Sequence, residues 1–114
     1  MFIKHLDQIA EEIPTLEGTK SCTVRWLIGQ KDGAKNYAMR LFELQPNGII
    51  PLHFHEETEH EIFVVEGEGV INDGENDIKV KKDDVIFIKP GEKHSFINNS
   101  QNPLKFICII PILK

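Results

Sequence analysis

Residues 48–67 read GIIPLHFHEETEHEIFVVEG, and residues 81–98 read KKDDVIFIKPGEKHSFIN. Four of the five histidines fall in these two stretches, at positions 53, 55, 60 and 94. They stand beside or within short apolar runs, where imidazoles are unusual, because burying a ring nitrogen without a partner costs roughly 1–3 kcal/mol. Repeating that cost without a shared partner is unfavourable. The pattern therefore favours one ion held by several histidines.

The spacing of these histidines suits a metal site. His53 and His55 are two residues apart, and on an extended strand such residues point to the same face. His60 precedes an apolar strand, and His94 follows a Pro-Gly turn and opens another strand. A closed barrel would bring the four together. Neutral imidazole is the commonest protein metal ligand and accepts divalent transition metals from manganese to zinc.

An acidic turn, EETE at residues 56–59, separates His55 from His60. Such charge runs usually form a solvated turn, which is the interpretation for Glu56 and Glu57. Glu59 or Glu61 could instead replace His60 as a ligand. In a regular strand Glu61 points away from the His60 face, so both ligate only across a bulge. This alternative stays open.

The composition describes one domain of an ordinary soluble type, with 114 residues, 40% hydrophobic and 27% charged. A formal net charge of -5 argues against nucleic acid or an anionic membrane as partner. Acidic residues near the N-terminus and no apolar run argue against a secretory signal, so a cytoplasmic protein is expected. Cys22 and Cys108 are then expected as free thiols, although one bridge between them stays open.

The chain reads as short antiparallel strands separated by Gly, Pro, Asn and Asp clusters, which indicates a sandwich or barrel. Helical spacing is confined to residues 5–13 and ends at Pro14. Asp73-Gly74 is a hairpin signal. Strands are predicted at 23–28, 37–44, 62–65, 69–72, 78–80, 85–88, 95–98 and 104–110, with breaks at 31–33, 46–48, 73–74, 90–91 and 98–103.

The segment FICIIPIL at 106–113, which contains most of the last predicted strand, is apolar on both faces. A strand with one wet face should alternate, so the outer face is expected to be covered. A partner subunit in a homodimer would bury this surface, at about 25 cal/mol per Å² before association costs. Coverage by the N-terminal segment of the same chain is the alternative.

The two histidine stretches resemble the motifs of the cupin superfamily. The first motif reads G-x5-H-x-H-x3,4-E-x6-G; His53 and His55 match its HxH, and His60 stands at its Glu. Gly67 closes the motif, whereas Gly48 is one residue nearer to the HxH than the pattern asks.

The second motif reads G-x5-P-x-G-x2-H-x3-N, and Gly91, His94 and Asn98 match it. Lys89 stands at its Pro and Asp83 at its first Gly. Pro90 occupies the variable position, so the turn is expected to survive.

The resemblance implies an all-β double-stranded β-helix, or jelly-roll cupin barrel, with a short N-terminal helical segment. A single domain would span 1–114, with the barrel at about 36–111 and the N-terminal helix and strands at 1–35. The sequence is similar to small single-domain cupins with a four-histidine site, the manganese-binding ones included. The implied cofactor is one six-coordinate Mn, Fe, Ni, Cu or Zn ion, with His53, His55, His60 and His94 as ligands and two adjacent open positions.

These open positions favour a metal-dependent oxidoreductase, a dioxygenase acting on a small apolar or aromatic molecule. Two alternatives stay open: a non-catalytic module that binds or senses a small molecule, and a metal-dependent isomerase or lyase. The last of these needs a base at the pocket, for which only the turn glutamates are available.

Other residues are candidates for the pocket wall. Phe106 and Cys108 share one strand face and would line a dry pocket if that face points inward; a buried Cys is otherwise a small core hydrophobe. Arg40, among apolar neighbours, could anchor a substrate carboxylate, with a surface salt bridge as the alternative. Trp26 and Tyr37 are interpreted as packing or interface residues.

Overall fold

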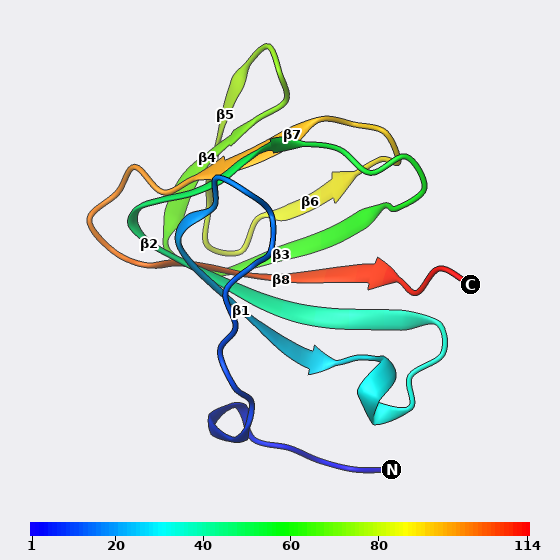
Figure 1. The fold of residues 1–114 in the computed structure, drawn as a ribbon. Helices are drawn as coiled ribbons and strands as arrows, with labels where there is room; N and C mark the ends of the chain where they lie inside the picture. The colour runs from blue at the N-terminus through cyan, green and yellow to red at the C-terminus, as the bar shows by residue number, and fades with distance from the viewer.

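Eight antiparallel strands form one curled sheet in the computed structural model, which describes residues 1–114 (Figure 1). The order is β5-β4-β7-β2-β8-β3-β6, and β1 pairs with the free side of β2. The strands are β1 (Lys20–Ile28), β2 (Tyr37–His53), β3 (His60–Glu66), β4 (Glu68–Asn72), β5 (Asp77–Lys81), β6 (Val85–Ile88), β7 (His94–Ile97) and β8 (Leu104–Pro111). The predicted all-β jelly-roll class is confirmed.

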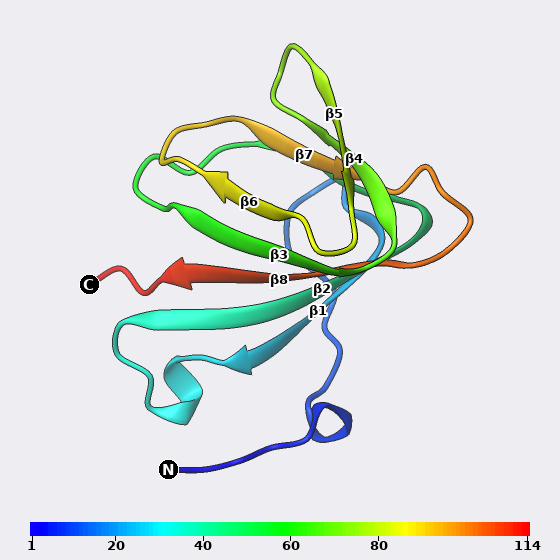
Figure 2. The ribbon, with the colours of Figure 1, turned by 180° about the vertical axis from the view of Figure 1, so that it is seen from behind.

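The sheet curls because β2 belongs to two layers. Its first half pairs with β1 and β8, and its second half pairs with β7. Figure 2 shows β1, β2, β8, β3 and β6 side by side, with β4 and β7 facing them across the curl. The interior of the curl is the space in which the candidate site forms.

The predicted break at residues 46–48 is wrong, because β2 runs through it for 17 residues. Both halves of the strand keep hydrogen-bonded partners, so the turn-forming residues bend the strand without ending it. At the bend Asn47 has a φ of 69°. A side chain on Gly48 would stand 2.7 Å from the Ser21 carbonyl oxygen, so the backbone of the neighbouring strand β1 is too close there for any larger residue.

The predicted helix over residues 5–13 shortens to one 3-10 turn, η1 (Leu6–Gln8). No residue of η1 is buried, so no packing stabilises a longer helix. A second 3-10 turn, η2 (Gln30–Asp32), follows β1. Neither turn is long or apolar enough to cross a bilayer.

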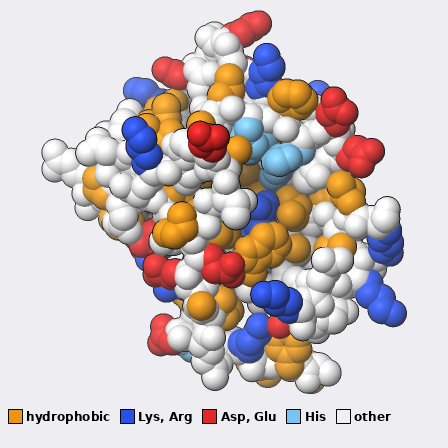
Figure 3. Space-filling view, viewed as in Figure 1, with side chains coloured by type: hydrophobic (Ala, Val, Ile, Leu, Met, Phe, Trp, Pro, Cys, Tyr) orange, Lys and Arg blue, Asp and Glu red, His pale blue; other side chains and the backbone are white.

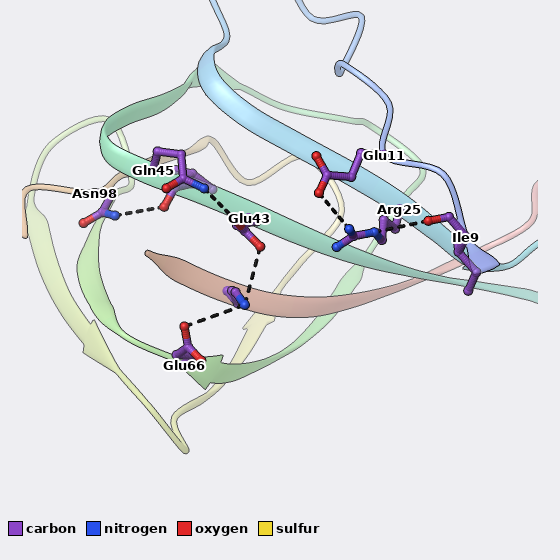
Figure 4. Close-up of polar contacts among 9 residues, drawn as sticks. Ile9, Glu11, Arg25, Glu43, Gln45, Glu66 and Asn98 are labelled. Carbon is purple, nitrogen blue, oxygen red and sulfur yellow. Dashed lines mark hydrogen bonds and ion pairs between the residues drawn. The ribbon is translucent and has the colours of Figure 1, made fainter. Parts of the chain in front are cut away.

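After η1 the chain lies along the free edge of β1. Glu12 and Val24 exchange two backbone hydrogen bonds of 2.8 Å. Arg25 donates to the Ile9 carbonyl oxygen at 3.2 Å and pairs with Glu11 at 2.7 Å (Figure 4). These contacts go to β1, so they do not support the alternative in which the N-terminal segment covers β8.

The core lies between the two layers. Stacked rings cross it, with Phe106 on β8 at 5.2 Å from Phe42 and 4.6 Å from Phe96, measured between centroids. Cys22 and Cys108 are buried free thiols, as expected. The buried cluster consists of Cys22, Leu44, Ile50, Ile62, Val64, Ile71, Val80, Ile88, Phe96, Leu104, Phe106 and Cys108.

Asn98, the last residue of the second motif, is fully buried beyond the end of β7. Its amide nitrogen donates to the carbonyl oxygens of Leu44 at 2.9 Å and Asn102 at 2.8 Å. Its amide oxygen accepts from the backbone and the hydroxyl of Ser100. Figure 4 shows this amide beside β2. Asn98 therefore ties the β7–β8 loop to β2.

Two residues take the left-handed conformation where the motifs have glycine. Asn47, six residues before His53, has φ 69°, and Asp83 has φ 75°. Asn and Asp tolerate this region better than other L-residues. The turns therefore survive without their glycines. At Gly67 no residue with a side chain can replace glycine, because an added Cβ would clash with the Pro103 carbonyl oxygen.

The outer face of the sheet carries an apolar row across four strands. Leu41 on β2 pairs with Ile107 on β8, Ile107 with Phe63 on β3, and Phe63 with Val85 on β6. Val85 is 77% exposed and Phe63 42% exposed. The homodimer expected from the apolar last strand stays a prediction.

Candidate functional site

A cavity of about 270 Å³ lies inside the curl of the sheet. Its wall includes the four histidines and the three candidate pocket residues Arg40, Phe106 and Cys108. Figure 3 shows histidines beside a hollow on this face, with apolar side chains and a basic side chain within it. The sequence-predicted residues therefore share one enclosed space.

Three strand ends and one loop bring the imidazoles together. His53 ends β2 and is the cross-strand partner of His94, which begins β7. His60 begins β3, and His55 lies in the loop between β2 and β3. The ring centroids are 4.3 Å apart for His53 and His94, 4.9 Å for His60 and His94, 5.1 Å for His53 and His55, and 5.6 Å for His55 and His60.

Backbone carbonyls set the tautomer of two of these rings. Nδ1 of His53 is 2.7 Å from the carbonyl oxygen of Pro51, and Nδ1 of His94 is 2.9 Å from that of Glu92. A carbonyl only accepts, so Nδ1 carries the proton and Nε2 keeps a free lone pair. This is the arrangement that orients metal-ligating histidines.

Burial keeps two of the rings neutral. Burial is the largest cause that lowers the pKa of His60 to about 3 and the pKa of His94 to about 4, and the charges of the other histidines contribute to both shifts. The pKa of His55 is also lowered, first by burial and then by His53 and Arg40. Neutral imidazole is the form that ligates metals.

Four neutral imidazole donors suit a divalent transition metal, although in this structure the rings are not oriented towards one common point. In this arrangement no three His, Cys, Asp or Glu side chains are positioned to hold an ion. Nδ1 of His60 is buried and has no hydrogen-bond partner. Ligation therefore requires small ring rotations, for which His55, exposed on its loop, has room.

His53 and His55 face the same cavity, as expected, although β2 ends at His53 and His55 therefore lies outside the strand. The rings approach because of the loop that follows, which is held where the Gly91 amide donates to the His55 carbonyl oxygen at 2.7 Å. Neither Glu59 nor Glu61 lines the cavity. Glu61 is exposed and pairs across the sheet with Phe87, whereas His60 is buried on the inner face.

Arg40 projects from β2 into the cavity wall. Its Nη2 donates to the Cys108 sulfur at 3.2 Å, and its guanidinium carbon lies 5.4 Å from the Trp26 ring centroid and 4.9 Å from that of Phe42. It forms no ion pair with a carboxylate, so the surface salt bridge is absent.

Some wall residues escaped the sequence interpretation. Trp26, taken as a packing residue, lines the cavity with Val24 from the same face of β1. The alternation of Cys22, Val24 and Trp26 is the signal that could have placed it. Thr19 and residues 12–16 also line the cavity. Nothing in the sequence indicates this, because it depends on where the N-terminal segment crosses.

A curled jelly roll with histidines gathered at its strand ends, around an internal cavity, defines the cupin class of protein. This chain belongs to the cupin family, because the family's domain matches residues 40–110.

Relatives with descriptive names span most of the chain. The oxalate-binding protein of Thermotoga maritima is 31% identical over 99% of this chain and 95% of its own length. The structure of the polyketide cyclase RemF from Streptomyces resistomycificus is similar with a TM-score of 0.92 and 36% identity, over 97% of this chain and 79% of that one. A predicted oxalate decarboxylase from Thermotoga maritima is similar with a TM-score of 0.86 and 28% identity, over 98% of this chain and 100% of that one.

Proposed function

We propose that this cupin is a metal-dependent enzyme that acts on a small organic molecule in the cavity. One divalent ion would be held by His53, His55, His60 and His94. The observation that carries the proposal is the set of four imidazoles at one cavity, with Nδ1 of His53 and His94 occupied by carbonyls and the pKa of His60 and His94 lowered. Such rings offer lone pairs without a proton to displace.

The ligand set constrains the metal. Four neutral nitrogen donors favour Ni, Cu or Zn over harder ions, whereas the resemblance to four-histidine manganese-binding cupins keeps Mn and Fe as candidates. Since no carboxylate ligand offsets its charge, the bound ion would supply strong Lewis acidity, and redox chemistry if it is Mn, Fe or Cu. Oxygen-rich anions are therefore the expected ligands.

The reaction class follows from what else lines the cavity. A non-redox isomerase or lyase needs a protein base, and the only carboxylate in the wall is Glu12, which is exposed. An oxidation of a substrate that already carries an ionised oxygen needs no such base. Apolar walls from Phe42, Phe96 and Phe106 would exclude bulk water from it. We therefore place a dioxygenase first, acting on a small apolar or aromatic substrate.

A non-catalytic binding protein is the second candidate. It is supported by the similarity to the oxalate-binding protein, which spans nearly all of both chains. The similarity to RemF supports a different ligand, a larger polyketone. Oxalate and polyketides are both oxygen-rich molecules, which agrees with the ligand chemistry expected at the four histidines.

Oxygen uptake by iron- or manganese-loaded protein tests the enzyme proposal, with a 1,3-diketone acidic enough to be ionised to its enolate at the assay pH as substrate. His60→Ala should lose both metal and uptake, whereas His5→Ala, at the exposed histidine before η1, should lose neither. Equal uptake by His60→Ala and the parent would contradict the proposal. Oxalate binding without any turnover of the diketone would favour the binding protein.

We further propose that a second copy of the chain covers the outer face of β3 and β6. The support is the exposed end of the apolar row, at Val85 and Phe63, together with the neighbouring Phe87, which is 55% exposed. Two-fold symmetry would pair this row with itself. Light scattering should report a dimer for the parent and a monomer for Val85→Glu; a monomeric parent would contradict the dimer.

A further inference from the structure

Three buried side-chain atoms have no hydrogen-bond partner in the protein: Thr19 Oγ1, Arg40 Nε and His60 Nδ1. All three residues line the same cavity. Folded proteins satisfy nearly all their buried polar groups, and an unsatisfied one costs roughly 1–3 kcal/mol. Among the three residues Arg40 also has no charged partner in the protein, so its guanidinium is available to an anionic ligand in the cavity.

Arg40 is the unusual member of this group, because it is a cation in a largely apolar wall without a counter-ion. Its contacts are the Cys108 sulfur and two aromatic rings, none of which carries a negative charge at neutral pH. Burial raises the pKa of the Cys108 thiol, so the thiol stays protonated. The guanidinium therefore has no counter-ion, and only one of its five N–H donors is hydrogen-bonded within the protein.

The local structure explains why Arg40 is held in this way. Trp26 is its cross-strand partner on β1, and Phe42 lies two residues further on the same face of β2. Cys108 is its cross-strand partner on β8. These three neighbours position the guanidinium by cation–π and hydrogen-bond contacts. Planar aromatic surface therefore lies beside a fixed cation.

We propose that Arg40 forms an anion subsite for a ligand carboxylate, and that the aromatic body of this ligand lies against Trp26 and Phe42. The inference deepens the proposed function, on which it rests for the cavity as the ligand site. It names the ligand class, an aromatic acid, and residues separate from the four histidines. Arg40 is here a binding residue, and Trp26 and Phe42 position it.

Size and charge both agree with this occupant. A cavity of about 150 Å³ accepts benzene, so about 270 Å³ has room for a ring with a carboxylate. The chain has a net charge of -5, so its overall field repels anions. Selective anion binding would therefore have to come from local groups such as Arg40.

The test uses benzoate and its neutral isostere benzamide as probes, titrated into the zinc-loaded and the metal-free full chain. Trp26 is the only tryptophan, so its fluorescence reports directly from the cavity wall. Arg40→Gln removes the proposed anchor. Arg25→Gln is the matched control, because it removes one arginine from the neighbouring strand that binds Glu11 and the Ile9 carbonyl oxygen instead.

Arg40→Gln should weaken benzoate at least about tenfold, because a hydrogen bond to a charged group contributes that much. Benzamide should bind parent and Arg40→Gln alike, and Arg25→Gln should bind benzoate as the parent does. Thermal unfolding of each variant checks that it is folded.

Equal benzoate affinity in the parent and Arg40→Gln would overturn the subsite, and so would a parent that binds no benzoate with or without zinc. If Arg40→Gln does not fold, Arg40→Met replaces it, because it removes the charge and keeps an unbranched apolar side chain, and a benzoate affinity equal to that of the parent would overturn the subsite. If the chain binds no zinc but still binds benzoate in a way that depends on Arg40, the proposed metal-dependent function is refuted and the subsite is not. Zinc binding that needs His60, with benzoate indifferent to Arg40, would refute the subsite alone.

Discussion

His94 and Asn98 lie four residues apart at opposite ends of β7, and both match the same motif, yet their surroundings differ. The side-chain amide of Asn98 makes all its hydrogen bonds within the protein: its nitrogen donates to two carbonyl oxygens, and its oxygen accepts twice from Ser100. His94 gives one ring nitrogen to the Glu92 carbonyl oxygen and keeps the other for the cavity. A buried polar group that the protein satisfies supports the fold, whereas one left partly free is available for a ligand.

The largest expected effect is the loss of metal binding in His94→Ala. Removing a group that only orients a metal ligand weakens metal affinity about 10–100-fold, so removing a ligand itself should weaken it more than about a hundredfold. Competition with a coloured chelator measures it. His5→Ala should retain the parent affinity, and a His94→Ala variant that does so as well would refute the four-histidine site.

Asn98→Ala should instead lower the stability of the fold and leave metal binding unchanged. It leaves the buried carbonyl oxygen of Leu44 without its side-chain donor and removes one of two side-chain donors to that of Asn102, at a cost of about 1–3 kcal/mol in the free energy of unfolding. Urea denaturation gives the value. The folded fraction should still bind metal with the parent affinity. A stability change below about 0.5 kcal/mol would show that Asn98 is no structural tie.

Low pH should destabilise the metal-free protein through two buried histidines, His94 at the start of β7 and His60 at the start of β3. The pKa of His60 is lowered to about 3 and that of His94 to about 4, while unfolded histidine has a pKa of about 6.5. The unfolded state therefore binds more protons between these values, and stability falls as pH decreases from about 6.5 towards 3. One pKa unit corresponds to about 1.4 kcal/mol, so the loss is on the order of a few kcal/mol.

Urea midpoints between pH 4 and 8 follow this loss, and above pH 6.5 the two histidines should contribute no slope. The double variant His60→Gln, His94→Gln should show a flatter profile below pH 6.5. Asn98→Ala, which changes no titrating group, should keep the slope of the parent. A double variant with the parent slope would assign the acid sensitivity to other groups.

The smallest effect is expected at Asp83, the left-handed residue where the motif has glycine. Asp83→Gly should leave stability unchanged within about 1 kcal/mol, because glycine takes this conformation freely. Asp83→Ala should cost about 1 kcal/mol, because alanine does not. Thermal unfolding distinguishes them; equal melting temperatures would show that the backbone is not strained there.

Local patterns predicted those elements whose signals are short-range. The hairpin at Asp73-Gly74 forms as expected, with Asn72 paired to Asp77 across it. The break at residues 46–48 and the helix at 5–13 were wrong for one reason. In both segments tertiary pairing decided: β2 keeps a partner on each side of its bend, whereas η1 has no surface on which to pack.

The sequence by itself determined the all-β class, the cupin motifs and the four histidines, because hydrophobic alternation and ligand spacing are properties of neighbouring residues. Only the tertiary structure decided that Arg40 faces Trp26 and Cys108 without a counter-ion, and that Thr19 shares its cavity. It also decided which buried atoms lack partners. Such facts depend on strand register and on the path of the N-terminal segment, which arise from contacts between residues far apart in the chain.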